Sequence, residues 1–332
     1  MSRVRLPPSL AAAILAFGST SVLNAQSRTV ALTIDDLPFV TASSTHPTQP
    51  VDAGQAAAAN RKLLDALARH HVPVTGFVIQ KDVEDLGLAS GTQILSEWTT
   101  RGFDLGNHSY AHPDFNDLTI EQFEDQIIRG ETTFVPLMKA AGRKPEFFRF
   151  PYNHTGDTKE KQDAMAAFLA QHGYRLAPCT IETSDWMFNM AYGRMLERHD
   201  DASASRLQGD YLAFTSAQID YFGRLNRQVL GYDPPQIMLI HDNQLNADMI
   251  EQLLTLFEKK QYRWVTLSEA ESDQVYRAPE TFITKYGPMW AYRWAKERGV
   301  KVDGSLEPEP PQWISNYGKQ EPVAPRRPHG AN

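Results

Sequence analysis

The chain has 332 residues, of which 42% are hydrophobic and 22% charged, a composition typical of globular proteins and not of disordered or collagen-like ones. Its formal net charge of −7 argues against nucleic acid as a partner. With Cys179 as its single cysteine, the chain cannot form an intramolecular disulfide, and the apolar neighbours of Cys179 predict a small buried side chain.

Residues 1–25 have the pattern of a secretory signal peptide. The basic residues Arg3 and Arg5, an apolar run from Leu10 to Phe17 and the small residue Ala25 follow in that order. No later stretch reaches the roughly 18 apolar residues that a membrane-spanning helix needs. Loss of Arg3 and Arg5 on cleavage would change the formal charge from −7 to −9. We therefore expect an exported chain, periplasmic or secreted, without a membrane span.

The remaining chain alternates between strand and helix patterns. Thr29–Ile34 is a β-branched, apolar run of strand length, and residues 53–69 place leucines on a helical period. The later predicted elements are a strand at 72–79, a helix at 92–100, a strand at 103–106, a long helix that opens with a capping box at Thr119 and continues to Phe134, and strands at 146–150, 174–179, 236–240 and 262–266. Strands that alternate with helices predict a parallel sheet, and seven of them in series favour a barrel.

Two regions fall outside this alternation. A polar segment at about 187–232, expected to be helical, is inserted before the sixth strand. A C-terminal extension at 272–332 carries Trp290 and Trp294 and then becomes proline-rich, which predicts a mobile tail. The predicted organisation is thus a signal peptide at 1–25, a barrel at 26–271 and the extension.

Residues capable of catalysis follow the ends of the predicted strands. The carboxyl ends of parallel strands share one face of an α/β fold, and active sites are built there. The residues at these positions are Asp35 and Asp36 after the first strand, His108 and His112 after the third, Arg149 to Tyr152 at the fourth, Asp185 and Trp186 after the fifth, and His241 after the sixth.

Two of these groups predict a metal site with an adjacent base. His108 and His112 lie four residues apart, and two imidazoles with the Asp36 carboxylate suit a divalent metal such as zinc. Such a histidine pair alone is weak evidence, because unrelated surface or core histidines share the spacing. The neighbouring Asp35 could remain ionised and accept a proton, with Arg149 orienting it through a charge-assisted hydrogen bond.

The same segments resemble five ordered motifs of the polysaccharide deacetylase family, also called carbohydrate esterase family 4. The motifs are Thr33-Ile-Asp35-Asp36, His108-Ser-Tyr-Ala-His112-Pro113, Arg149-Phe-Pro151-Tyr152, Asp185-Trp186 and Leu239-Ile-His241. The resemblance implies a distorted (β/α)7 barrel over about residues 28–270, with the insertion before strand six and the C-terminal extension.

The resemblance also implies a role for each residue of the motifs. Asp35 would be the catalytic base, and Asp36, His108 and His112 would hold a divalent metal, with zinc preferred and cobalt, nickel or manganese as alternatives. The backbone N–H of Tyr152 would stabilise the oxyanion. His241 would protonate the leaving group while Asp185 keeps it charged. Trp186 and Leu239 would shape the acetyl pocket.

Departures from the family pattern concern the substrate more than the chemistry. Glu182 stands where the family often has an aspartate, and Asn153-His154-Thr155 replaces a commoner glycine. An N-acetylated glycan such as peptidoglycan or chitin is the expected substrate. An esterase for O-acetylated polysaccharide such as xylan would use the same residues. A carbohydrate-binding barrel without catalysis is the third alternative, although it would need neither Asp35 nor His241.

Overall fold

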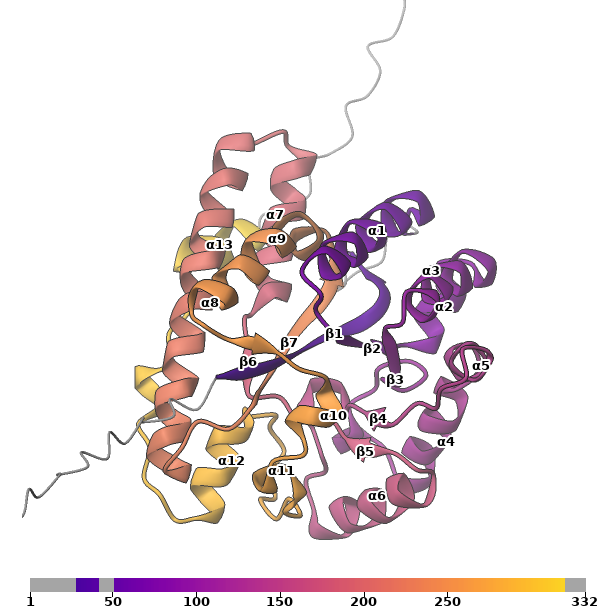
Figure 1. Cartoon of the computed structure of the whole chain (residues 1–332), viewed down its shortest axis with the longest axis vertical. Helices are drawn as coiled ribbons and strands as arrows, with labels where there is room; N and C mark the ends of the chain where they lie inside the picture. Colours follow the sequence, from indigo (N-terminus) through magenta and orange to yellow (C-terminus); the bar gives the residue numbers. More distant parts are fainter. Residues whose placement is uncertain (1–27, 42–50, 320–332) are drawn as a thin grey trace, which may run out of the picture.

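A curled sheet of eight parallel strands lies at the centre of the molecule (Figure 1). The computed structural model describes residues 28–41 and 51–319, so the signal pattern and the prolines at 322–328 lie outside the described residues. The strands are β1 (Thr29–Val40), β2 (Val74–Val78), β3 (Asp104–Asn107), β4 (Phe147–Phe148), β5 (Arg175–Leu176), β6 (Ile181–Glu182), β7 (Gln236–Asn243) and β8 (Arg263–Trp264).

The strand order makes the sheet an open barrel. Seven strands follow one another as β5-β4-β3-β2-β1-β7-β6, and β8 pairs with the start of β1. Helices surround this sheet on its outer side (Figure 1). The predicted class, a distorted barrel of parallel strands and helices, is confirmed. The additional strand β6, of two residues, was not predicted from the sequence.

The helices vary widely in length, and within the described residues none is both long and apolar enough to cross a membrane. They are α1 (Ala53–Arg69), α2 (Gln80–Asp85), α3 (Leu88–Thr100), α4 (Ile120–Gly130), α5 (Phe134–Ala140), α6 (Lys159–Gln171), α7 (Asp185–Glu197), α8 (Asp201–Leu230), α9 (Gln244–Lys259), α10 (Leu267–Ala270), α11 (Gln274–Arg277), α12 (Trp290–Glu297) and α13 (Gln312–Gly318).

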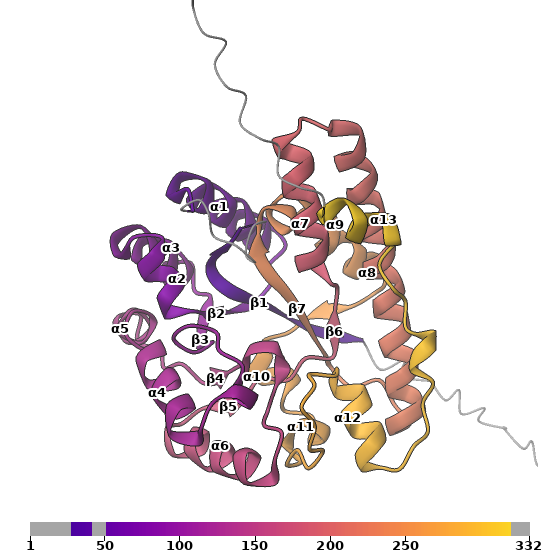
Figure 2. The ribbon, with the colours of Figure 1, turned by 180° about the vertical axis from the view of Figure 1, so that it is seen from behind.

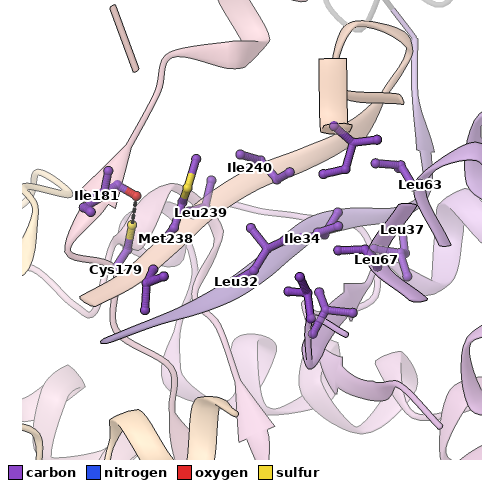
Figure 3. Close-up of a cluster of buried hydrophobic side chains, with 14 of the residues drawn as sticks. Leu32, Ile34, Leu37, Leu63, Leu67, Cys179, Ile181, Met238, Leu239 and Ile240 are labelled. Atoms are coloured by element: carbon purple, nitrogen blue, oxygen red, sulfur yellow. Dashed lines mark hydrogen bonds between the residues drawn. The ribbon is translucent and has the colours of Figure 1, made fainter. Parts of the chain in front are cut away.

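Strand β1 is buried on both faces because it lies between the helices and the barrel interior. Its residues alternate, so that Leu32 and Ile34 belong to the large outer core while Ala31 belongs to the inner cluster. Figure 3 shows the outer core, where α1 contributes Leu63 and Leu67. Full burial of such a leucine or isoleucine side chain stabilises the fold by about 1.5–3 kcal/mol. The strand that carries Asp35 and Asp36 is therefore held firmly by the core.

The single long helix predicted from Thr119 to Phe134 is wrong, because the structure divides it into α4 and α5. The capping box at Thr119 is present. The helix ends at Gly130, and the backbone N–H of Thr133 donates to Oε1 of Gln80 at 3.0 Å. Glycine is a poor helix former, and the N–H of Thr133 is bonded to the Gln80 side chain of α2. Both features favour the end of α4 at this point. Pro136 then lies in the first turn of α5, where proline is tolerated.

The segment at 187–232 is helical, as expected, and it forms a second core. Helices α7 and α8 bury Phe188, Tyr211 and Phe214 against α9, and Ile314 of α13 completes the cluster. Figure 2 shows these four helices side by side. The segment therefore buries more apolar side chains than its polar composition suggested. Its apolar residues are spread along the 30 residues of α8 at helical spacing.

The described part of the C-terminal extension packs against the outer core and the segment between β5 and β6. Trp290 and Trp294 of α12 are buried in the outer core, and the N–H of Trp290 donates to the carbonyl of Cys179 at 3.0 Å. Cys179 lies between β5 and β6. It is fully buried, as expected, and burial raises the pKa of its thiol to about 12. The segment at Pro308 is also held, because its carbonyl accepts a hydrogen bond from Gln218.

Candidate active site

The neighbouring acids Asp35 and Asp36 lie within β1 and are directed to different partners. The register of β1 against β2 shifts between Ile34 and Leu37, and Asp36 has a φ of 61°. A left-handed backbone at this point turns the side chain of Asp36 away from the strand's regular alternation. Asp35 then faces Arg149, and Asp36 faces two histidines.

Asp36, His108 and His112 form the group of side chains best suited to a metal ion. Oδ1 of Asp36 lies 3.4 Å from Nε2 of His108 and 3.6 Å from Nε2 of His112. One possible ligand atom from each of the three residues falls within 4.8 Å of the others. The loop after β3 achieves this with positive φ angles at Ser109 and His112, and Oγ of Ser109 accepts the N–H of His112 at 3.0 Å.

The chemistry of this group fits a divalent cation. Nδ1 of His108 lies 2.8 Å from the carbonyl oxygen of Arg149, which places the proton on Nδ1 and leaves the Nε2 lone pair toward Asp36. Burial lowers the pKa of His112 to about 4, so this imidazole is neutral at pH 7. Oδ1 of Asp36 is buried without a hydrogen-bond partner among the described residues, as expected of an oxygen reserved for a cation.

Asp35 is held by a buried arginine that crosses the barrel. Nη1 of Arg149 donates to Oδ1 of Asp35 at 2.8 Å and to Oγ1 of Thr33 at 2.6 Å. Its Nη2 donates to the carbonyl of Pro178 at 3.1 Å, and the guanidinium lies over the ring of Phe77. With so many partners Arg149 is fixed, and it in turn fixes the orientation of the Asp35 carboxylate.

His241 and Asp185 form a second buried pair on the same face. Nδ1 of His241 lies 2.7 Å from Oδ1 of Asp185, and Nε2 lies 4.0 Å from Oδ2 of Asp36. Burial opposes a charge on His241, but the Asp185 carboxylate outweighs it and raises the pKa of His241 to about 10. His241 therefore carries a proton at neutral pH and directs its other nitrogen toward the candidate metal group.

The remaining residues of the motifs surround this centre. Tyr152 and Trp186 are 56% and 50% exposed, respectively, so both rings can contact a ligand from solvent, whereas Leu239 is buried. The ring of Tyr152 lies 4.6 Å from that of His112, centroid to centroid. Of the ten candidate residues named from the sequence, four lie within β1 and β7 (Asp35, Asp36, Leu239 and His241), four follow β3 and β4 (His108, His112, Arg149 and Tyr152), and Asp185 and Trp186 begin α7.

Several residues at the site were missed in the sequence. Nδ2 of Asn243 donates to Oδ2 of Asp185 at 3.1 Å, and Asn246 donates to the same oxygen. Their only signal is a position just after the His241 motif, at the start of α9. Asp82 of α2 was also missed. Burial and the charge of the nearby Asp36 raise the pKa of Asp82 to about 7. No motif pointed to it.

The fold and site together define a parallel α/β barrel with a candidate metal-binding active site at its strand ends. Residues 23–177 match the family model for polysaccharide deacetylases. Asp185 and His241 lie beyond the matched residues. The resemblance to the family is thus confirmed.

Known relatives share this family description. A peptidoglycan-N-acetylglucosamine deacetylase of Bacillus cereus is 29% identical over 38% of this chain and 40% of its own length. A chitin deacetylase of Colletotrichum lindemuthianum is 25% identical over 76% of this chain and 82% of its own length. The chain spans less than half the length of the first two curated relatives it matches.

Among solved structures, a mutant of a carbohydrate esterase family 4 pseudoenzyme from Bacillus anthracis, with restored enzymatic activity, is similar with a TM-score of 0.49. It is 17% identical, over 74% of this chain and 68% of its own.

Proposed function

We propose that the protein is a metal-dependent hydrolase that removes acetyl groups from an N-acetylated glycan of the peptidoglycan or chitin type. The observation that carries this proposal is the arrangement of three groups on one face of the barrel. A candidate metal triad of Asp36, His108 and His112 lies beside the Asp35 carboxylate on one side and the protonated His241 on the other. The family relatives that act on acetylated glycans support the choice of substrate.

In this proposal, Asp36, His108 and His112 hold the cation, whose Lewis acidity would activate water and polarise the acetyl carbonyl. Asp35 accepts the proton of the attacking water, because the hydrogen bond from Arg149 holds its carboxylate in a fixed orientation. The backbone N–H of Tyr152 donates to the oxygen on which negative charge develops.

His241 and Asp185, on the opposite side of the site, act on the leaving group. Nε2 of His241 gives its proton to the departing nitrogen, and Asp185 stabilises the imidazolium before the transfer. Trp186 and Leu239 would enclose the acetyl methyl group. An amine leaves poorly without a proton, so a histidine that is protonated at neutral pH suits an N-acetyl substrate.

The experiment that tests the proposal is acetate release by the purified protein from a panel of glycans, N-acetylated and O-acetylated, before and after removal of metal. We expect release from N-acetylated oligosaccharides that is lost on chelation and restored by zinc or cobalt. Release from acetylated xylan alone would identify an esterase. No release from any glycan with zinc bound would favour a carbohydrate-binding barrel.

We further propose that residues 1–25 direct export to the periplasm or the medium. The order of basic, apolar and small residues in this segment supports the proposal. N-terminal sequencing of the protein recovered from cells and medium tests it, with cleavage after Ala25 as the expected result. An intact N-terminus on protein that stays inside the cell would contradict it.

A further inference from the structure

The turn that carries Tyr152 has a backbone conformation that its own residues disfavour. Tyr152 and Asn153 have φ angles of 57° and 55°, and both lie in the left-handed region. Residues with a side chain adopt this region reluctantly, and two in succession persist only where the surroundings hold them. The contacts around this turn therefore decide where the N–H of Tyr152 lies.

One of these contacts comes from α12 of the C-terminal extension. Nη2 of Arg293 donates to the carbonyl of Asn153 at 2.6 Å, and Nη1 donates to Oγ1 of Thr155 at 3.0 Å. The arginine is itself fixed, because it is 1% exposed, pairs with Glu280 and donates from Nε to the carbonyl of Pro288 at 3.0 Å. A planar guanidinium with its donors occupied in this way is a rigid support for the turn.

A second contact comes from the loop before α12. A Cβ atom added at Gly287 would lie 1.8 Å from the carbonyl oxygen of Tyr152, so only glycine allows the two backbones to approach this closely. The same loop is also tied to the segment after β3, because the carbonyl of Lys285 accepts Nδ2 of Asn116 at 2.9 Å. The loop therefore packs directly against the backbone of the turn.

We propose that the C-terminal extension is part of the catalytic apparatus, with Gly287 and Arg293 as positioning residues that hold the peptide groups of Tyr152 and Asn153. This inference rests on the proposed function, in which the N–H of Tyr152 is the oxyanion donor. Neither residue contacts the substrate. Both act through the turn, and both lie outside the segment that matches the family model.

The sharpest test is Gly287→Ala, because one added methyl group must displace the Tyr152 carbonyl. We expect kcat to fall roughly tenfold or more, because a small misplacement of an oxyanion donor is costly, while KM and zinc affinity stay close to wild type. Gly304→Ala is the matched control, since its added Cβ would meet nothing closer than Tyr292 at 3.9 Å. Wild-type kcat in a folded Gly287→Ala protein would overturn the inference.

Arg293→Lys provides a second variant that keeps the positive charge beside Glu280. Lysine cannot reach both Asn153 and Thr155 from one nitrogen with the geometry of the guanidinium, so we expect a smaller loss of kcat. If Arg293→Lys only lowers the unfolding temperature and leaves kcat unchanged where the protein is folded, Arg293 is structural and its proposed role is wrong.

Hydrogen exchange measured by mass spectrometry separates this inference from the proposed function. Faster exchange in peptides covering residues 150–155 is expected in both variants and not in Gly304→Ala. Unchanged exchange there would overturn the inference, and so would faster exchange with unchanged kcat. If the wild-type protein releases no acetate from any glycan, the proposed function fails, and the catalytic role assigned to the extension fails with it. The exchange result then still shows whether the extension holds the turn.

Discussion

Both oxygens of the Asp185 carboxylate bind His241, one 2.7 Å from Nδ1 and the other 2.8 Å from the backbone nitrogen. The side chain and the main chain of the histidine are thus held by the same fully buried group. This pairing fixes the direction of Nε2 and the charge of the ring together, and it makes the protonation of His241 depend on Asp185.

Replacing Asp185 should therefore change the pH dependence of catalysis. Burial lowers the pKa of His241, and the Asp185 carboxylate raises it. In Asp185→Asn this carboxylate is gone, so the pKa of His241 should fall from about 10 toward or below its ordinary value. A proton donor must be protonated to act. We expect acetate release to be lost more at pH 8–9 than at pH 6, with the basic limb of the kcat profile moved to lower pH. A loss of equal size at every pH would show that Asp185 does not control the charge of His241.

Removing the imidazole should reduce turnover without emptying the metal site. We expect His241→Ala to lower kcat roughly a hundredfold or more, as is common for loss of a general acid, with normal bound zinc. The loss should be larger on an amide substrate than on an ester, because an alcohol leaves more readily without a proton. His172→Ala, at an exposed position, is the control. Equal small losses on both substrates would rule His241 out as the acid.

The adjacent aspartates should give opposite phenotypes. Asp36→Asn removes a charged ligand, so zinc affinity should fall and activity should recover partly at high zinc. Asp35→Asn should keep its zinc and lose turnover even when the metal site is saturated, because it removes the proton acceptor. Bound zinc and kcat would be measured for both proteins. Our assignment is reversed if Asp35→Asn is the variant that loses metal.

A pH-dependent contribution to stability is expected where α1 meets α9. His70 pairs with Glu258 at 2.7 Å and Glu251 at 2.9 Å, and these carboxylates raise its pKa. The pairing favours the protonated form, so its contribution is complete below about pH 6.5, the unfolded value, and is lost as pH rises through the folded pKa.

The corresponding measurement is chemical denaturation of His70→Gln at two pH values. We expect the variant to be less stable than wild type by about 0.5–1 kcal/mol at pH 5.5 and by almost nothing at pH 9, the size of a surface ion pair. The double variant Glu251→Gln with Glu258→Gln should abolish this pH dependence. A stability difference that grows with pH would contradict the assignment.

The sequence allowed the fold class and the candidate site to be predicted because both depend on local patterns. Strand-length apolar runs marked the sheet, and polar motifs directly after them marked the face where Asp36, His108 and His241 meet. The order of the strands, and the contact of Arg293 with Asn153, could not be predicted. Both depend on which distant segments pack together. The periodic pattern of apolar residues within one segment does not indicate which distant segment packs against it.

The break between α4 and α5 illustrates the same limit. The apolar positions from Ile120 to Phe134 keep a helical period through the break, so the pattern does not predict that the helix ends between them. What ends the helix is Gly130 together with a hydrogen bond from Thr133 to Gln80, a residue far away in the chain. Asn243 and Asn246 were missed for a related reason, since an asparagine at a helix start usually serves only as a cap.

The central position of β1 has a consequence for how the chain folds as it is made. One edge of β1 pairs with β2, which follows closely, but the other pairs with β7, and Oγ1 of Thr33 donates to the carbonyl of Met238, 205 residues later. Until that part is synthesised, a strand with a strongly apolar sequence has one edge without its native partner. Contacts between such distant residues slow folding and leave the nascent chain open to aggregation. The two aspartates of β1 and His241 come together only at this late step, so a chain that stops short of β7 would lack the candidate active site as well as the complete sheet.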